Sequence, residues 1–354
     1  MYRRLLVILV AFLVLGMGWR PPEPPETIRD AVYENYPDGN VLIGGNFESL
    51  DCLDIINREF GNLTSGNAFK QLKIHPKPDV WDFFLTDRFV QNTIDNNQTY
   101  YIHSPIGPQC SAWAKDDSRT ADELETNLRE FVEVVASYYS QDALYMEVVN
   151  ETVIKGEWFG PKPGSDSWEN PWTIIGFENN GVPKYIKIAF EVAMENASTD
   201  CKLVWNQHEK LDRRSWELIF DTILWLRSEG IRIDAIGWHA HLNAGEESLE
   251  GNNLLRELIS TTHLLGMDFI VTELDVSIRD IGENPTIEQL QAQADTYKAV
   301  LDIVLEFKDT GTVGVSFWST SDKCTWKPQY YPGLFDYDGE PKPSYDVILD
   351  TLRY

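Results

Sequence analysis

Two glutamates give the clearest indication of chemistry in this sequence. Glu151 follows the apolar run 144–149 and Asn150, and Glu273 follows the apolar run 269–272. If both runs are buried strands, the two carboxyl groups face one cleft, although 122 residues (273 minus 151) separate them. A protonated carboxyl can then protonate a leaving oxygen while an ionised one attacks the adjoining carbon, as in glycosidic-bond hydrolysis. Two such neighbours also push their pKa values apart, because joint ionisation is unfavourable.

The residues beside these glutamates suit the same chemistry. An Asn at position 150 can hydrogen-bond the 2-hydroxyl of the sugar being cleaved, and His241 can hold an ionised Glu273 in place. His239 and His241 are two residues apart, a spacing also found in some metal-binding barrels. The sequence offers no clear third ligand set, so we expect neither a metal nor a cofactor.

The elements that must position these residues are short, β-branched apolar runs separated by helical patterns. The predicted strands are 41–45, 60–64, 99–103, 144–149, 203–205, 233–237, 269–272 and 313–317. Apolar residues three and four apart predict helices at 121–139, 185–194, 216–227, 254–265 and 287–307. Alternating strands and helices indicate a parallel sheet, and eight such units favour an α/β fold with a single (β/α)8 TIM barrel.

A barrel of this kind carries its catalytic residues at the carboxyl ends of its strands. The residues at those predicted ends are polar, acidic or aromatic: His103, Asn150, Glu151, Asn206, Gln207, His239, His241, Glu273, Asp275 and Trp318. This concentration favours an active site over a barrel without one.

Composition narrows the classes of partner. The formal net charge is −26, which argues against nucleic acids and other polyanions. Twelve Trp and fifteen Tyr suit either a well-packed core or a ligand with flat apolar faces, such as a sugar. We expect the chain to act as a monomer on such a ligand.

The N-terminal segment resembles an export signal. A basic pair precedes an apolar run that is short for a membrane span, so we interpret residues 1–18 as a signal peptide, or alternatively a signal anchor. Residues 19–30 form a proline-rich linker, and residues 31–354 form the catalytic domain. The protein is therefore expected outside the cytoplasm, secreted or periplasmic, with no membrane contact beyond such an anchor. The four cysteines at 52, 110, 201 and 324 allow three full disulfide pairings or buried free thiols.

Several motifs resemble glycoside hydrolase family 10, which holds endo-β-1,4-xylanases of barrel fold. The matching segments are 60–70 (FGNLTSGNAFK), 148–151 (VVNE), 270–275 (IVTELD), 318–326 (WSTSDKCTW), 334–336 (LFD) and 341–345 (PKPSY). Their order and spacing cover nearly the whole chain from Phe60 to Tyr345.

This resemblance implies an endo-acting enzyme that cleaves xylan with retention of configuration. Glu151 matches the general acid/base and Glu273 the nucleophile. The positions that match substrate-binding residues are Asn67, Lys70, His103, Asn150, His239, His241, Trp318 and Trp326. The implied partner is a xylan-type polysaccharide or oligosaccharide.

The sequence departs from the family pattern at four positions that we interpret as lying in the cleft: Gly66, Gln98, Ile102 and His239. These changes predict remodelled sites for the non-reducing sugars, and so a decorated or mixed-linkage xylan as substrate. Residues 152–183 form a long stretch rich in Trp, Pro and Gly, which would line the product-side sugars or form a rigid surface cover.

Two other functions remain open at this point. One is a related retaining glycosidase that acts on another β-glucan or on xylo-oligosaccharides. The other is a catalytically weak carbohydrate-binding protein, against which the presence of both glutamates argues.

Overall fold

The computed structural model describes residues 27–103, 106–164, 168–208, 211–246, 249–282 and 284–353. The predicted signal segment and most of the predicted linker lie outside this part of the chain. Helix α1 (Ile28–Asn35) begins inside the segment that we assigned to the linker. Its first residue is buried, and the Ile28 amide donates to a carboxylate oxygen of Glu59, so the folded domain includes this helix. Among the described residues, no helix is long and apolar enough to span a bilayer.

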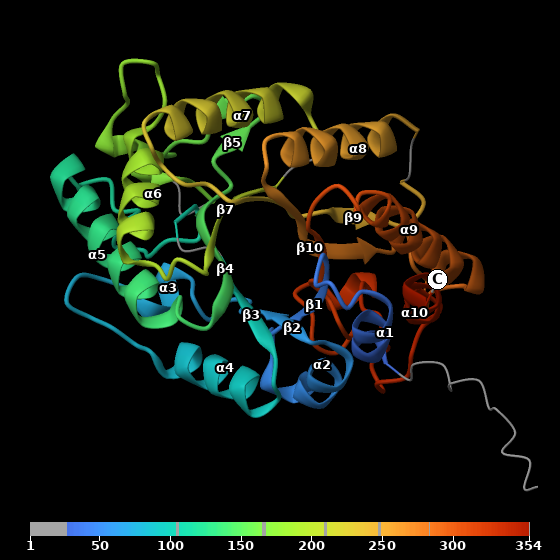
Figure 1. The fold of residues 1–354 in the computed structure, drawn as a ribbon. Helices are drawn as coiled ribbons and strands as arrows, with labels where there is room; N and C mark the ends of the chain where they lie inside the picture. Colours follow the sequence, from blue (N-terminus) through green and yellow to red (C-terminus); the bar gives the residue numbers. More distant parts are fainter. Residues whose placement is uncertain are drawn as a thin grey trace, which may run out of the picture.

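Eight parallel strands form the centre of the molecule (Figure 1). They are β1 (Val41–Asn46), β2 (Asn62–Thr64), β3 (Thr99–Ile102), β4 (Ala143–Asn150), β7 (Lys202–Gln207), β8 (Ala235–Trp238), β10 (Asp268–Ser277) and β11 (Val313–Phe317). The last strand, β11, pairs with both β1 and β10, which closes the sheet into a barrel. The predicted single (β/α)8 barrel is confirmed.

Helices surround the barrel on the outside (Figure 1). The longer ones are α2 (Leu53–Glu59), α4 (Phe84–Asp95), α5 (Ala121–Tyr139), α6 (Lys184–Asn196), α7 (Arg213–Ser228), α8 (Leu249–Leu264), α9 (Ile287–Leu305) and α10 (Pro343–Arg353). Helices α5 and α9 each begin with a capping box, formed by Thr120 and Glu123 in α5 and by Thr286 and Gln289 in α9. In each box, the side chain of either residue accepts a hydrogen bond from the backbone amide of the other. All five predicted helices are present.

Short elements fill the connections between these units. They are α3 (Gln71–Ile74), the hairpin of β5 (Val153–Ile154) and β6 (Glu157–Trp158), β9 (His241–Asn243) beside β10, and the 3-10 turns η1 (Leu50–Cys52), η2 (Pro171–Ile175) and η3 (Pro328–Tyr330).

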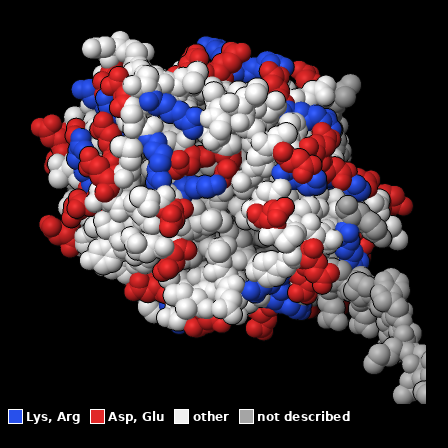
Figure 2. Space-filling view, viewed as in Figure 1, with Lys and Arg blue, Asp and Glu red and all other residues white. Residues whose placement is uncertain are grey.

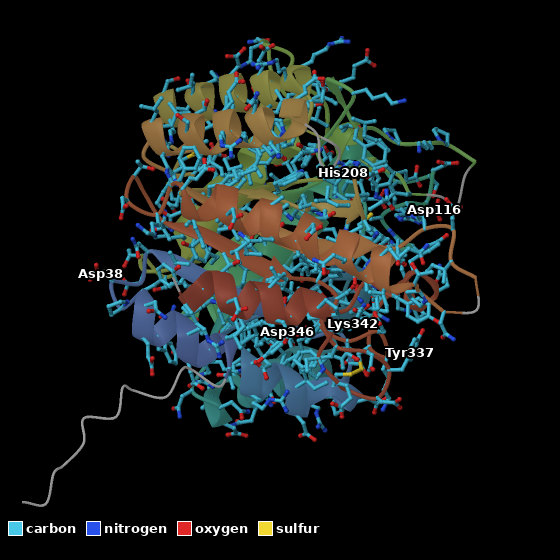
Figure 3. All side chains as sticks on the ribbon, turned by 90° about the vertical axis from the view of Figure 1, so that its right-hand side faces the viewer. Asp38, Asp116, His208, Tyr337, Lys342 and Asp346 are labelled. Carbon is cyan, nitrogen blue, oxygen red and sulfur yellow. A yellow bond between two sulfur atoms is a disulfide. The ribbon has the colours of Figure 1, made fainter. Side chains whose placement is uncertain are left out.

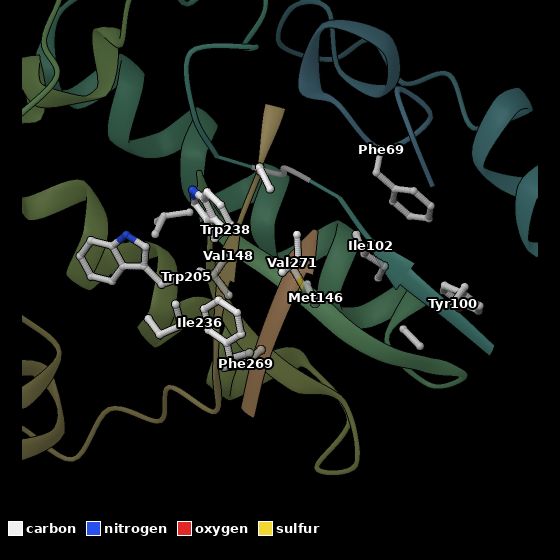
Figure 4. Close-up of a cluster of buried hydrophobic side chains, with 14 of the residues drawn as sticks. Phe69, Tyr100, Ile102, Met146, Val148, Trp205, Ile236, Trp238, Phe269 and Val271 are labelled. Atoms are coloured by element: carbon white, nitrogen blue, oxygen red, sulfur yellow. The ribbon is translucent and has the colours of Figure 1, made fainter. Parts of the chain in front are cut away.

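The alternation of side chains along each strand produces two apolar clusters. One fills the inside of the barrel and contains Tyr101, Tyr145, Val204, Ala235 and Ile270. The other is larger and lies between the strands and the helices. Figure 4 shows part of the larger cluster, with Trp205, Trp238 and Phe269 contributed by β7, β8 and β10.

The two ends of the barrel are distinct. In Figure 3, Asp38, which precedes β1, lies on one side of the molecule, and His208, which follows β7, lies toward the other. Acidic side chains are spread over the face shown in Figure 2, as the net charge of −26 leads one to expect.

One disulfide, Cys52–Cys324, joins the start of α2 to the segment after β11. Cys110 and Cys201 are buried free thiols. The sequence left this pairing open, since residues 272 positions apart meet only once the barrel closes.

Candidate active site

Both glutamates lie close to a register shift in the pairing of a barrel strand with its neighbour. The pairing of β4 with β7 shifts register between Glu147 and Val149, just before Glu151. The pairing of β10 with β11 shifts between Val271 and Leu274, around Glu273. Such irregularities re-aim side chains next to active sites. Glu151 also has a left-handed backbone with φ of 54°, which is costly for a residue with a side chain.

The carboxyl group of Glu151 is held from outside the barrel. The indole Nε1 of Trp168, on the segment between β6 and η2, donates to Glu151 Oε2 over 2.8 Å. The Trp168 ring packs against Phe159 and His208, with centroids 4.3 and 4.8 Å away. The other carboxylate oxygen, Oε1, lies 3.8 Å from His239 Nδ1.

The carboxyl group of Glu273 is held by histidines from the strand ends. His241 Nε2 lies 3.2 Å from Glu273 Oε2 and hydrogen-bonds to it. The other oxygen, Oε1, lies 3.1 Å from His239 Nε2 and 3.6 Å from His103 Nδ1. Oε1 is buried and makes no hydrogen bond within the described chain.

His239 lies between the two glutamates. Its Nε2 also hydrogen-bonds Asn150 Oδ1 over 2.9 Å, which joins the end of β4 to the end of β8. One imidazole ring therefore lies within 3.8 Å of a carboxylate oxygen of each glutamate. Glu151 and Glu273 face the same cleft, as the sequence predicted.

His241 belongs to a chain of polar contacts that ends on Trp326. Its Nδ1 lies 3.0 Å from Asp275 Oδ2, which also accepts a hydrogen bond from the Trp326 indole over 2.7 Å. Burial alone would lower the pKa of His241, but Asp275 and Glu273 together raise that pKa to about 10. His241 is therefore an imidazolium cation at neutral pH.

The two glutamates differ in their electrostatics. Burial, followed by repulsion from Glu273, raises the pKa of Glu151 to about 7. The Trp168 hydrogen bond and the positive charges of Lys70 and His241 oppose that rise. Burial lowers the pKa of His103 to about 3 and lowers the pKa of His239 well below its ordinary value, so both rings are neutral. Glu151 thus has the properties of a proton donor near neutrality.

His239, His241 and Glu273 bring potential metal-ligating atoms within 4.8 Å of one another. His241 lies 3.2 Å from Glu273 Oε2 through Nε2 and 3.0 Å from Asp275 Oδ2 through Nδ1. Pairing with these two carboxylates accounts for the arrangement, so we assign this group to hydrogen bonding.

The remaining predicted substrate-binding residues surround the same cleft. Lys70 is buried after β2, and its charge acts on Glu151. Asn67 lies in the same turn and is exposed, and its side chain makes no hydrogen bond within the described part of the chain. Trp318 is buried with its ring against His103. Trp326 is 46% exposed; its ring packs against His241, and the Lys327 ammonium lies 3.6 Å from the ring centroid.

Two of the four positions that we predicted to lie in the cleft, Gln98 and Ile102, lie elsewhere, so their predicted placement is wrong. Gln98 precedes β3 and donates to the Phe60 carbonyl, so it lies at the amino end of the barrel, away from the glutamates. Ile102 is the last residue of β3 and is fully buried in the core. Because β3 ends at Ile102, only His103 and the residues after it can reach the cleft. Gly66 and His239 remain as genuine departures there.

Sequence reasoning missed two acidic residues near the cleft. Glu147 is buried in β4, and its carboxylate lies 3.1 Å from His103 Nδ1. Glu48 follows β1, and the charges of Asp275, Lys70 and Glu273 act on it. Glu48 was detectable, because it stands at the end of a predicted strand as Glu151 does.

The stretch 152–183 is fixed on the barrel through one tryptophan and contacts the candidate site through another. Trp172 is fully buried and donates to the Gly107 carbonyl, which fixes the segment on the barrel. Trp168, in contrast, reaches Glu151. The segment therefore covers part of the barrel and contributes one hydrogen bond to Glu151, while its contact with product-side sugars stays a prediction.

The fold and the paired carboxylates define a barrel enzyme equipped to hydrolyse glycosidic bonds. The chain belongs to glycosyl hydrolase family 10, whose family model matches residues 30–351. It is 31% identical to endo-1,4-beta-xylanase A of Caldicellulosiruptor saccharolyticus over 84% of this chain and 87% of that protein. It is 28% identical to a beta-1,4-xylanase of Dictyoglomus thermophilum, over 98% of this chain and 97% of that one. The solved structure of a family 10 protein from Paenibacillus barcinonensis superposes with a TM-score of 0.78 at 25% identity, covering 89% of this chain and 95% of the other.

Proposed function

We propose that this chain is an endo-1,4-β-xylanase that cleaves internal β-1,4-xylosidic bonds by double displacement, with Glu273 as nucleophile and Glu151 as acid/base. The observation that carries the proposal is that the two carboxyl groups face one cleft on either side of His239, in a barrel of family 10. The relatives named above are xylanases, which supports xylan as the substrate. Residues 1–26 are not described, and export remains a proposal from their sequence.

In the first step, the Glu273 carboxylate attacks the anomeric carbon while Glu151 gives its proton to the leaving oxygen. Trp168 donates to Glu151 Oε2, so the transferable proton resides on Oε1, the oxygen beside His239. The bond from sugar to leaving oxygen breaks as the ester to Glu273 forms.

In the second step, Glu151 is a carboxylate and takes a proton from water, whose oxygen attacks the same carbon and releases Glu273. The Trp168 indole then stabilises the anionic form of Glu151. The charged His241 stabilises Glu273 whenever that carboxylate is free. Two displacements on one carbon return the original configuration.

The sugars next to the cleaved bond would contact the indole rings and the amide at the strand ends. Trp326 is 46% exposed, which suits contact with an apolar part of a pyranose, and Asn150 suits the 2-hydroxyl. The exclusion of a side chain at Gly66 and the wall from Trp168 support a modified sugar chain as substrate, namely a decorated or mixed-linkage xylan.

The test is reducing-sugar release from unsubstituted xylan, arabinoxylan, glucuronoxylan, mixed-linkage xylan and β-glucans. We expect release from at least one xylan and low release from the unsubstituted one. Equal rates on all four xylans would reject the modified-chain proposal while leaving the xylanase activity in place. Xylan binding without any release would indicate a carbohydrate-binding protein, and release from β-glucans alone would indicate a different glycosidase.

A further inference from the structure

The end of β1 directs a carboxyl group into the cleft. Along this strand, Leu42 lies beside the cluster inside the barrel, whereas Ile43 belongs to the outer core. Phe47 also belongs to the outer core, with its ring 5.2 Å from that of Phe89 in α4. The Phe47 amide donates to the Thr64 carbonyl over 2.9 Å, which continues the pairing with β2 beyond Asn46. Because side chains alternate along a strand, Glu48 points inward, above the barrel.

The position across from Glu48 on the β2 side has no room for a side chain. Gly66 has a φ of 54°, and a Cβ there would lie 2.4 Å from the Phe47 carbonyl oxygen. Any larger residue at position 66 would therefore have to displace the backbone that leads to Glu48. The two features are coupled, because the backbone at the end of β1 occupies the space that a side chain at position 66 would need.

One oxygen of the Glu48 carboxyl group lacks a hydrogen-bond partner in the described part of the chain. This oxygen, Oε2, is buried. Such an oxygen is costly to bury unless something else supplies the bond. The charged groups that act on Glu48 are Asp275, Lys70, Glu273 and His241, which are those around the site described above.

We propose that Glu48 is a sugar-binding residue on the non-reducing side of the cleft, where it hydrogen-bonds a hydroxyl of a neutral pyranose one unit away from the cleaved bond. This inference rests on the proposed function. Burial, then repulsion from Asp275, raises the pKa of the Glu48 carboxyl to about 8. The group is therefore neutral at pH 6 and can both donate and accept, as a sugar hydroxyl can.

The test compares two chromogenic substrates that differ by one sugar, nitrophenyl β-xyloside and nitrophenyl β-xylobioside, at pH 6. With Glu48→Ala we expect kcat/KM on the xylobioside to fall about tenfold, through KM, because one sugar hydrogen bond is lost. The rate on the xyloside should stay within about twofold, because the second sugar is absent. Glu48→Gln, which matches the neutral acid in shape, should retain most of the xylobioside activity.

Glu48→Asp is a second variant in case Glu48→Ala fails to fold, because it keeps the carboxyl group and only shortens the side chain. It should show the same selective loss of activity on the xylobioside. Glu34→Ala, an exposed glutamate on α1, is the matched control and should change nothing. Equal losses on both substrates, or no loss on either, would overturn the role of Glu48. If wild type cleaves neither substrate and no xylan, the proposed function itself fails, which is a separate outcome.

Discussion

The surroundings of the two glutamates differ in origin. Glu273 is surrounded by His103, His239 and His241, which stand at the ends of barrel strands or directly after them. Glu151 instead receives its hydrogen bond from Trp168, on a segment outside the barrel framework. The difference teaches that the barrel itself fixes the environment of the proposed nucleophile, whereas a connecting segment adjusts that of the proposed acid.

The strongest test of this comparison removes each carboxyl in turn. Glu273→Ala should lower kcat by about 10⁴-fold or more, because the covalent route is lost. Added azide should restore turnover and give a glycosyl azide of inverted configuration, since a small anion can enter from the vacated side.

Glu151→Ala should behave differently. Substrates with good leaving groups need little acid assistance, so their bond cleavage should survive, and azide should give a product of retained configuration. Product configuration is read by nuclear magnetic resonance. The opposite pattern in the two variants would exchange the roles of Glu151 and Glu273.

A smaller effect is expected from the carboxylate behind His241. Asp275→Asn removes the main group that raises the pKa of His241, so this ring loses its positive charge at a lower pH. We expect kcat to fall about 10- to 100-fold, because a charge-assisted hydrogen bond to Glu273 is weakened. The loss should grow with increasing pH. Asp338→Asn, at an exposed position, is the control, and a loss independent of pH would contradict the role of the imidazolium.

The pH profile tests the contribution of Trp168. Glu151 must be protonated to act as an acid, so wild-type kcat/KM should decline above pH about 7, which is the pKa of this carboxyl. The Trp168 hydrogen bond lowers that pKa, so Trp168→Phe should move the decline to higher pH. Trp158→Phe, in the preceding hairpin, should leave the profile unchanged. An unshifted profile in Trp168→Phe would mean that the segment only covers the barrel.

The smallest effect on activity is expected from removing the disulfide between the start of α2 and the segment after β11. Replacing both Cys52 and Cys324 by Ser should lower the free energy of unfolding by about 2–4 kcal/mol, because the unfolded chain is no longer cross-linked. Activity well below the unfolding temperature should be nearly unchanged. Denaturant unfolding with and without reductant measures this, and an equal effect of reductant on the double variant would point away from this disulfide.

The sequence predicted what local periodicity and strand ends can determine. Each barrel strand was located, and Glu151, His241 and Glu273 were placed around one cleft. The error at Gln98 came from a motif matched without knowing where β3 ends. An error of a few residues along a four-residue strand moves a side chain from one end of the barrel to the other.

Contacts made between distant segments were not predictable in the same way. The Cys52–Cys324 bond and the Trp168–Glu151 hydrogen bond depend on how connections pack on the closed barrel. The sequence marked Trp168 as one of several tryptophans in a long segment, and no local pattern separates it from Trp172, which is buried. The reason that position 66 is glycine appears only when the end of β1 is seen against it.

The most direct test of the assignment is to trap the covalent intermediate. The reagent is a xylobioside with fluorine at the 2-position of the reacting sugar and a good leaving group. The fluorine slows both the formation and the hydrolysis of the glycosyl enzyme, whereas the leaving group accelerates only its formation. The glycosyl enzyme therefore forms faster than water releases it. Mass spectrometry of the digested protein should find the sugar on the peptide that contains Glu273. A label on Glu151 or on another residue, or no label in an enzyme that cleaves xylan, would contradict the account.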